Sequence, residues 1–334
     1  MIRRVAVALG VVIALLALAW GALALHFAGP AALATALPVA WIAAGLAVLW
    51  WVRPARRALA VLAVLFAGLM IWWSSLEPRN DRDWLPDVAE LPTGELHGNL
   101  LTLHNVRVFD YRTETDFTPR WEDRTYDLSL LQGADLFLSH WGSPAIAHTI
   151  VSWAFADGQH LAVSIETRKE RGESYSAVAG FFKQYELCYV AADERDVVRL
   201  RTNYRGENVY LYHLRTPVAR ARAMLLDYVA RMNALAAAPV FYDAATQNCT
   251  TTIRMHTEEI GVHSAWDWRL LANGYIDQML YEQGIVDTSL PFAELRARSN
   301  IDERAKAAGD DPAFAARIRD GLPQPTLLPS PPAP

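Results

Sequence analysis

The stretch Ala147–Arg168, AHTIVSWAFADGQHLAVSIETR, predicts the β-hairpin around which the rest of the fold is arranged. Polar and apolar side chains alternate in both halves, which is typical of paired strands with one buried face. Asp157-Gly158 lies between the halves and favours a tight turn, because glycine accepts a positive φ. We therefore expect strands at Ala147–Phe155 and His160–Arg168.

The register of this hairpin decides which polar side chains meet. Directly opposed residues share a face, so the polar faces match with a three-residue turn, Asp157–Gln159, but not with a two-residue one. His148 then lies opposite Arg168, with Glu166 as a diagonal neighbour. The predicted polar patch consists of His148, Ser152, Ser164, Glu166 and Arg168. An ordinary solvated sheet face shows the same alternation, so the patch alone does not establish a site.

Short alternating runs on both sides of the hairpin predict further strands, and helical spacing predicts helices between and after them. The other strands are expected at Leu100–Tyr111, Ala134–His140, Tyr185–Ala191 and Asn208–Arg215. Helices are expected at Tyr175–Gln184, at Pro217–Ala236, after Asn248 and within Ser264–Gly284. Together these elements predict an α+β fold with an antiparallel sheet and helices. The proline-rich segment 322–334 is expected to be a disordered tail.

Cys249, in the segment Phe241–Ile253, is the candidate nucleophile. The preceding Asn248 is a strong helix N-cap residue, so Cys249 is expected at the first position of a helix. The partial positive charge of a helix start stabilises a thiolate and lowers the pKa of the thiol. The other cysteine, Cys188, lies in the apolar run of a predicted strand and is expected in the core. A disulfide between the two is the alternative, and it would silence the nucleophile.

A thiolate nucleophile needs a general base and a group that orients this base. The chain has nine histidines. His148 is preferred because it lies mid-strand beside a carboxylate and a guanidinium, and His140 is the second choice. His256 lies about two helical turns beyond Cys249, and His160 adjoins the hairpin turn, so neither is expected to act. No CxxC or HExxH pattern is present, and neither a metal nor a cofactor is expected.

Residues 1–76 differ sharply from the rest of the chain. They contain no Asp or Glu, and uncharged stretches cover residues 5–25, 31–52 and 58–76. About 20 apolar residues span about 30 Å of hydrocarbon, so three transmembrane helices are expected. The alternative is a cleaved signal peptide followed by a helical hairpin. The chain is thus expected to be an integral membrane protein, with an outer domain at residues 77–321 after the anchor.

The basic residues set the expected orientation of this anchor. Its basic residues flank the first stretch at the N-terminus and separate the second from the third: Arg3, Arg4, Arg53, Arg56 and Arg57. Because positive loops stay in the cytoplasm, we expect a cytoplasmic N-terminus and a periplasmic outer domain on the inner (cytoplasmic) membrane. The net charge is −5 although the anchor is basic, so the outer domain is acidic. An acidic domain repels phosphates, which excludes a nucleic-acid partner.

Several stretches of the outer domain, taken in order, resemble the Lnb N-terminal periplasmic domain family. They are Asn80–Trp84, Ala147–Thr149 with Ser152-Trp153, Ser164–Glu170, Tyr185–Leu187, Asp193–Asp196, and Phe241-Tyr242 leading into Asn248–Thr251. The resemblance spans roughly residues 80–320 and is carried by the ordered set of stretches. A wider resemblance is to permuted NlpC-type papain-like folds, in which a strand histidine precedes a cysteine at a helix start.

Family membership implies a cysteine acyltransferase with Cys249 as nucleophile and His148 as general base. Glu166 is the third candidate by position, and Ser164 or Arg168 could serve in its place. Supporting residues are expected to be Asn248, Ser164, Arg168 and Ser152. Enzymes of this family move an acyl chain from the glyceryl group of a lipoprotein's N-terminal cysteine to its α-amine, which leaves a lyso-form. The implied partners are therefore membrane lipids and lipoproteins.

Two other functions remain open from the sequence. One is a periplasmic cysteine peptidase or amidase acting on cell-wall peptides, and the other is a non-catalytic module of envelope assembly with an inert cysteine. A peptidase predicts a polar groove near Cys249, whereas acyl transfer predicts an apolar channel there. The surroundings of the nucleophile therefore discriminate between the two enzymes.

Overall fold

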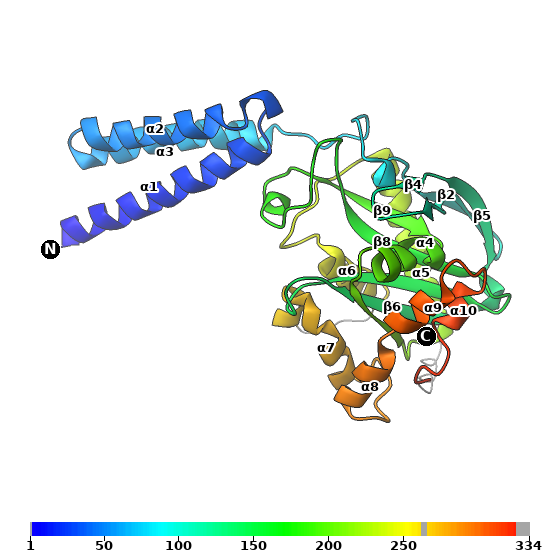
Figure 1. Ribbon diagram of the computed structural model, residues 1–334. Helices are drawn as coiled ribbons and strands as arrows, with labels where there is room; N and C mark the ends of the chain where they lie inside the picture. The colour runs from blue at the N-terminus through cyan, green and yellow to red at the C-terminus, as the bar shows by residue number, and fades with distance from the viewer. Residues whose placement is uncertain (1, 262–265, 325–334) are drawn as a thin grey trace. The chain divides into compact units, whose positions relative to one another are not determined.

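The computed structural model describes residues 2–261 and 266–324 (Figure 1). The chain divides into two compact units. The helical unit comprises Met1–Arg79, Tyr175–Glu186 and Val240–Asp243, and the sheet unit comprises the remainder. Two short segments from later in the chain thus join the N-terminal helices in one unit.

The helical unit contains three apolar helices, α1 (Ile2–Phe27), α2 (Ala36–Trp51) and α3 (Ala55–Ser74). Two of them are long and apolar enough to cross a membrane, Arg4–Phe27 and Ala55–Ser74. The prediction of three spans is therefore wrong for the second. Its first residues, Ala31–Leu33, form a 3-10 turn, and the 16 residues of α2 extend only about 24 Å against the roughly 30 Å of a bilayer core.

The described part of the sheet unit is built on an eight-stranded sheet, which confirms the α+β class. Its order is β1 (Thr93–His97), β2 (Leu100–Arg107), β9 (Glu186–Ala192), β8 (His160–Arg168), β7 (Ala147–Phe155), β6 (Leu131–His140) and β10 (Asn208–His213), with β5 (Trp121–Asp127) paired to β2. Neighbours are antiparallel where their registers are resolved, except β2 and β9, which meet in parallel at Arg107 and Ala192. Strands β3 (Asp110–Tyr111) and β4 (Phe117–Thr118) form a separate ribbon.

The central hairpin has the predicted strands but a different register. Ile150 pairs with Ser164 and Ser152 with Ala162, so the polar faces match as expected. The turn residues are one position earlier than predicted, because Phe155 and Gln159 bond across the turn and Gly158 carries the positive φ of 86°. This register places Glu166, and not Arg168, across from His148.

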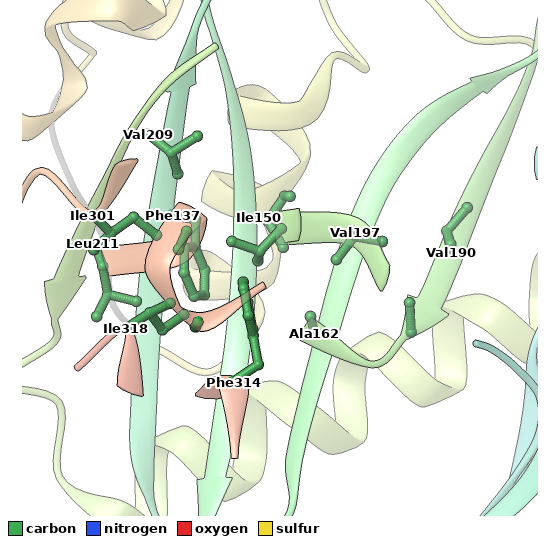
Figure 2. Packing of buried hydrophobic residues seen from close by; sticks show 14 of the residues in the cluster. Phe137, Ile150, Ala162, Val190, Val197, Val209, Leu211, Ile301, Phe314 and Ile318 are labelled. Atoms are coloured by element: carbon green, nitrogen blue, oxygen red, sulfur yellow. The ribbon is translucent and has the colours of Figure 1, made fainter. Parts of the chain in front are cut away.

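Helices cover both faces of the sheet, as the alternation along β7 requires. Ile150 packs with Phe137 into a core closed by α4 (Glu194–Arg199), α9 (Asp302–Ala308) and α10 (Phe314–Arg317), seen in Figure 2. Trp153 lies on the opposite face of β7 from Ile150. Its indole N–H donates to the Ala221 carbonyl of α5 (Val218–Ala237) at 2.9 Å. Helix α6 (Cys249–Glu259) follows α5, and α7 (Ile276–Glu282) and α8 (Phe292–Ser299) come next.

Three predicted elements differ from the structure. Tyr175–Gln184 is a loop with one 3-10 turn, Ala179–Phe181. Its apolar residues are divided between the buried Ala179 and Phe182 and the exposed Val178 and Phe181, so they do not form the single buried stripe of a helix. Within Ser264–Gly284, residues 264–265 lie outside the described residues, and α7 is the α-helix that the later part forms. The expected tail 322–334 begins on Leu322, which is buried in the core, and its part from 325 onward lies outside the described residues.

Candidate active site

Cys249 is the first residue of α6, as predicted. The side chain of Asn248 accepts hydrogen bonds from the N–H groups of Thr250 and Thr251, both at 2.9 Å. The Asn248 N–H in turn donates to the Thr251 hydroxyl at 3.0 Å, which completes a capping box. This cap fixes the helix start, and its hydrogen bonds do not include the Cys249 N–H.

His148 and Glu166 lie close together where the hairpin opens. The ladder between β7 and β8 ends at Ile150 and Ser164, and the next residues of the same face follow on each strand. Glu166 Oε1 lies 3.2 Å from His148 Nε2. The Ser164 hydroxyl donates to Glu166 Oε1 at 2.6 Å and lies 2.6 Å from the same ring nitrogen. Because Ser164 donates to the carboxylate, its oxygen accepts from Nε2–H, which leaves Nδ1 for Cys249.

The charge of Glu166 changes the protonation of His148. Burial by itself lowers the pKa of His148, but the carboxylate and the hydrogen bonds with Cys249 and Glu166 outweigh burial and raise it to about 9. Arg201 opposes this rise through its positive charge. The pKa of Glu166 is held well below its ordinary value, because His148 and Arg201 outweigh the effect of burial. The ring is therefore an imidazolium at neutral pH.

The pKa of the Cys249 thiol is lowered, whereas that of His148 is raised. Burial by itself raises the pKa of the thiol, but the hydrogen bond and charge of His148, with a smaller contribution from the adjacent Thr149, lower it from 9.0 to about 7. Between about pH 7 and pH 9 the two side chains form a thiolate–imidazolium pair. A thiolate is the nucleophilic form of cysteine, so the pair is poised for attack on a carbonyl.

Asn273, which the sequence did not single out, completes the surroundings of the thiol. Its Nδ2 donates to Cys249 Sγ at 3.5 Å and to the Thr250 hydroxyl at 3.0 Å. Its Oδ1 accepts from the Ala147 N–H at 2.9 Å, which fixes the amide so that the donor end faces the sulfur. The neighbouring Gly274 permits this placement, because a Cβ there would lie 2.1 Å from the Pro144 carbonyl oxygen.

Arg201 is a second missed residue of the cluster, from the π-helical turn Leu200–Tyr204. Its Nη2 donates to Glu166 Oε1 at 2.9 Å, and its Nη1 lies 3.6 Å from Glu207 Oε2. The guanidinium therefore holds the carboxylate toward His148. No spacing in the sequence ties Arg201 to the hairpin, and only the tertiary fold brings them together.

Two predicted supporting residues lie elsewhere. Arg168 donates to the carbonyls of Val88 and Ala89, and its guanidinium stacks 4.3 Å above the Trp84 ring. Its role is to hold the segment before β1 on the sheet unit.

Ser152 is fully buried and donates to Glu194 at 2.5 Å. Arg319 bridges Glu194 to Asp135, so Ser152 belongs to a separate buried network. Arg168 and Ser152 were included in the predicted patch only because they share the polar face of the hairpin. That face extends beyond the site at both ends.

The three other histidines that the sequence analysis considered have structural surroundings of their own. His256 is buried, with Nδ1 2.5 Å from Asp227 and Nε2 2.7 Å from the Tyr189 hydroxyl. His140 lies beside Arg296, and burial lowers its pKa. His160 lies at the hairpin turn near the Gly158 carbonyl. The geometry therefore selects His148 among the candidates.

A cavity of about 530 Å³ lies between the sheet and helices α5, α6 and α7. Its walls are largely apolar and come from residues that include Leu136, Val151, Met224, Ile253, Ile276 and Met279. Thr149 and Thr250, which follow His148 and Cys249 in sequence, also line it. Arginine side chains contribute at Arg215, Arg220 and Arg254. Its volume is typical of sites for small organic ligands, which run from about 300 to 1,000 Å³.

The comparisons with known proteins give one family. The model of the Lnb N-terminal periplasmic domain matches residues 117–274, a region that contains His148, Glu166, Cys249 and Asn273. The match is shorter than the resemblance expected over roughly residues 80–320. Comparison with curated proteins and with solved structures gives no match.

Proposed function

We propose that this chain, whose residues 117–274 match the model of the Lnb N-terminal periplasmic domain family, is a membrane-anchored cysteine acyltransferase. The proposed reaction moves an acyl chain from the glyceryl group of a bacterial lipoprotein to its N-terminal amine through a thioester on Cys249. The apolar helices anchor the chain in the inner membrane with the N-terminus in the cytoplasm and the sheet unit in the periplasm. The order of His148 before Cys249 favours a permuted papain-like arrangement of the site.

The observation that carries this proposal is the largely apolar cavity lined by Thr250, whose hydroxyl lies 3.8 Å from Cys249 Sγ. Thr149 and Thr250 flank the reacting pair and also line the cavity. A peptide substrate would need polar groups along its groove, whereas these walls match a hydrocarbon chain. Each buried CH₂ contributes about 0.8 kcal/mol to binding, so a cavity of this size favours a long acyl group.

The first step forms the thioester. The Cys249 thiolate attacks the ester carbonyl, and the bond between that carbon and the glyceryl oxygen breaks. His148 gives its Nδ1 proton to the departing oxygen, so the site is left with a thioester and a neutral ring. General acid catalysis of this kind contributes about 10²–10⁴-fold to a rate.

Two N–H donors support the oxyanion that forms during this attack. The N–H of Cys249 lies outside the Asn248 cap, and Asn273 Nδ2 lies 3.5 Å from the sulfur. An oxyanion on the attacked carbon is separated from the sulfur by only two covalent bonds, which places it within reach of both groups. Asn273 is therefore assigned to the oxyanion hole in this proposal.

The second step transfers the acyl group to the amine. The neutral α-amine attacks the thioester, the carbon–sulfur bond breaks, and neutral His148 takes the proton that the amine loses. The thiolate–imidazolium pair is restored, and the products are an amide and the lyso-form. Glu166, held by Ser164 and Arg201, stabilises the imidazolium at the start and end of the cycle.

Tandem mass spectrometry of a lipoprotein N-terminus tests this function. The full-length protein in proteoliposomes is incubated with a diacylated lipoprotein, with Cys249→Ser as the inactive control. Intramolecular transfer leaves the total mass unchanged and moves one acyl chain to the amine, which fragmentation detects. Loss of an acyl mass would identify a hydrolase and contradict transfer. An unchanged N-terminus would contradict catalysis on lipoproteins.

A further inference from the structure

The loop Tyr175–Glu186 belongs to the helical unit, although it lies far from α1 and α3 in the sequence. Phe182 is buried among aromatic rings of these helices. Its ring centroid lies 5.9 Å from Trp20, 5.7 Å from Phe27 and 6.3 Å from Trp73. Phe27 and Trp73 lie in the last turns of α1 and α3, so Phe182 packs at one common end of the two helices.

Lys183 also contacts the end of α3, at Trp73. Its ammonium donates to the Trp73 carbonyl at 2.9 Å, and it lies 5.2 Å from the ring centroids of both Trp73 and Phe241. The last carbonyls of a helix carry partial negative charge, and an aromatic face attracts a cation. The two contacts on Trp73 therefore use both the backbone and the ring of one residue.

The other side of the loop exposes large apolar side chains. Val178 is 49% exposed and Phe181 is 50% exposed, beside the fully packed Phe182. The two residues are three positions apart across the 3-10 turn Ala179–Phe181, and a 3-10 helix has three residues per turn. They therefore point in similar directions, away from the contacts that Phe182 makes. Such an exposed apolar pair at the end of apolar helices marks an interaction surface.

We propose that Val178 and Phe181 insert into the outer leaflet of the membrane and hold the loop Tyr175–Glu186 at its interface. This inference rests on the proposed membrane anchor. Tryptophan gathers at the boundary between lipid and water, and Phe182 packs on Trp20 and Trp73, so the loop lies at that depth. A short apolar turn beside a cationic side chain is the composition of an interfacial segment.

The loop is bonded to the chain that leads into the nucleophile. The Tyr242 N–H donates to the Tyr185 carbonyl at 2.9 Å, and Phe241 forms a β-bridge with Glu186. The segment Val240–Asp243 belongs to the same unit as the loop, and Cys249 follows Asp243 by a few residues. A membrane-bound loop would thus stabilise the strand of chain that precedes the catalytic helix and favour substrates held in the bilayer.

Depth-dependent quenching tests the insertion without any requirement for catalysis. An NBD fluorophore is attached at Val178→Cys or Phe181→Cys in full-length Cys249→Ser, reconstituted in nanodiscs with spin-labelled lipid tails. Cys188 is buried and its thiol pKa is raised by burial, so it stays unlabelled. Val64→Cys, 71% exposed on α3, reports insertion of the anchor, and Asp157→Cys at the hairpin turn reports a soluble position.

We expect quenching at positions 64, 178 and 181 and none at 157. Quenching at 64 with none at 178 and 181 would overturn the loop inference and leave the anchor intact. No quenching at 64 would overturn the anchor itself, and with it the loop inference.

A second measurement addresses the role of the loop in catalysis. The double variant Val178→Asp and Phe181→Asp is compared with wild type on a lipoprotein in proteoliposomes and on a water-soluble short-chain ester. We expect at least a tenfold loss on the bilayer substrate and less than twofold change on the soluble ester. Equal losses on both substrates, or no loss on either, would contradict a membrane-docking role.

Discussion

Cys188 and Cys249 are both buried, yet the pKa values of their thiols are shifted in opposite directions. Cys188 lies within β9 among core residues, and burial raises its pKa because the apolar surroundings disfavour a charge. Cys249 lies at a capped helix start beside an imidazolium, which lowers its pKa to about 7 despite the burial. The opposite pKa shifts come from the groups that neighbour each sulfur. Replacement of the neighbours of Cys249 should therefore give it a raised pKa like that of Cys188.

The largest expected effect comes from removal of the nucleophile. Cys249→Ser should lower kcat/KM for acyl transfer by at least about 10³-fold, because a serine hydroxyl beside His148 is a far weaker nucleophile than a thiolate. Cys188→Ser is the matched control and should keep wild-type activity. Comparable losses in both variants would remove the distinction between the two cysteines.

Replacement of the base should make Cys249 resemble Cys188. His148→Gln should lower kcat by about 10³-fold, within the usual range for a general acid–base group. Without the imidazolium, burial dominates, so the thiol pKa should rise from about 7 to 9 or above. The pH dependence of iodoacetamide alkylation measures this shift. His140→Gln is the control, and an unchanged alkylation midpoint in His148→Gln would contradict the ion pair.

Loss of the amide donor should slow attack without changing the thiolate greatly. Asn273→Ala should lower kcat by about 10²-fold, as expected for one oxyanion-hole donor. The alkylation rate of Cys249 should stay within a few fold, because alkylation forms no oxyanion. Asn233→Ala, whose amide bonds to Gly94 instead, is the control. A parallel fall in alkylation and transfer would assign Asn273 to positioning of the thiol alone.

The charge of Glu166 should be visible in the pH profile. Transfer requires the thiolate and the imidazolium together, so activity should rise as pH increases through about 7 and fall through about 9. Glu166→Gln removes the charge that raises the pKa of His148, so the alkaline limb should move to lower pH. We expect about a tenfold loss at pH 8. An alkaline limb that stays in place would show that Glu166 does not set the pKa of His148.

The smallest effect on activity is expected at the core cysteine, where the change should appear in stability. Cys188→Ser buries a hydroxyl within β9 and should lower the free energy of unfolding by about 1–3 kcal/mol. Denaturant unfolding measures this change, and Cys188→Ala, which adds no polar atom, separates the hydroxyl from the loss of volume. A loss of transfer in the still-folded variant would place Cys188 in the site after all.

The sequence predicted the parts of the site that local rules determine. Alternation gave both hairpin strands, and the Asn248 cap placed Cys249 at the helix start. The predicted register of the hairpin was wrong by two residues. Matching the polar faces of the two strands allows every alignment that differs by two residues, so the prediction depended on which residues were assigned to the turn. Strands β1 and β5 were missed, because their charged and exposed side chains carry no apolar alternation. Asn273 and Arg201 are distant in sequence from the residues they contact, and no local pattern marks them.

The central claim is that acyl transfer proceeds through a thioester on Cys249. The full-length protein is quenched with acid during turnover of a diacylated lipoprotein, and its peptides are analysed by mass spectrometry before and after hydroxylamine treatment. The account predicts an acyl group on the peptide that contains Cys249, removed by hydroxylamine, and none on the peptide that contains Cys188. N-acylated product without any acyl group on Cys249 would contradict the account.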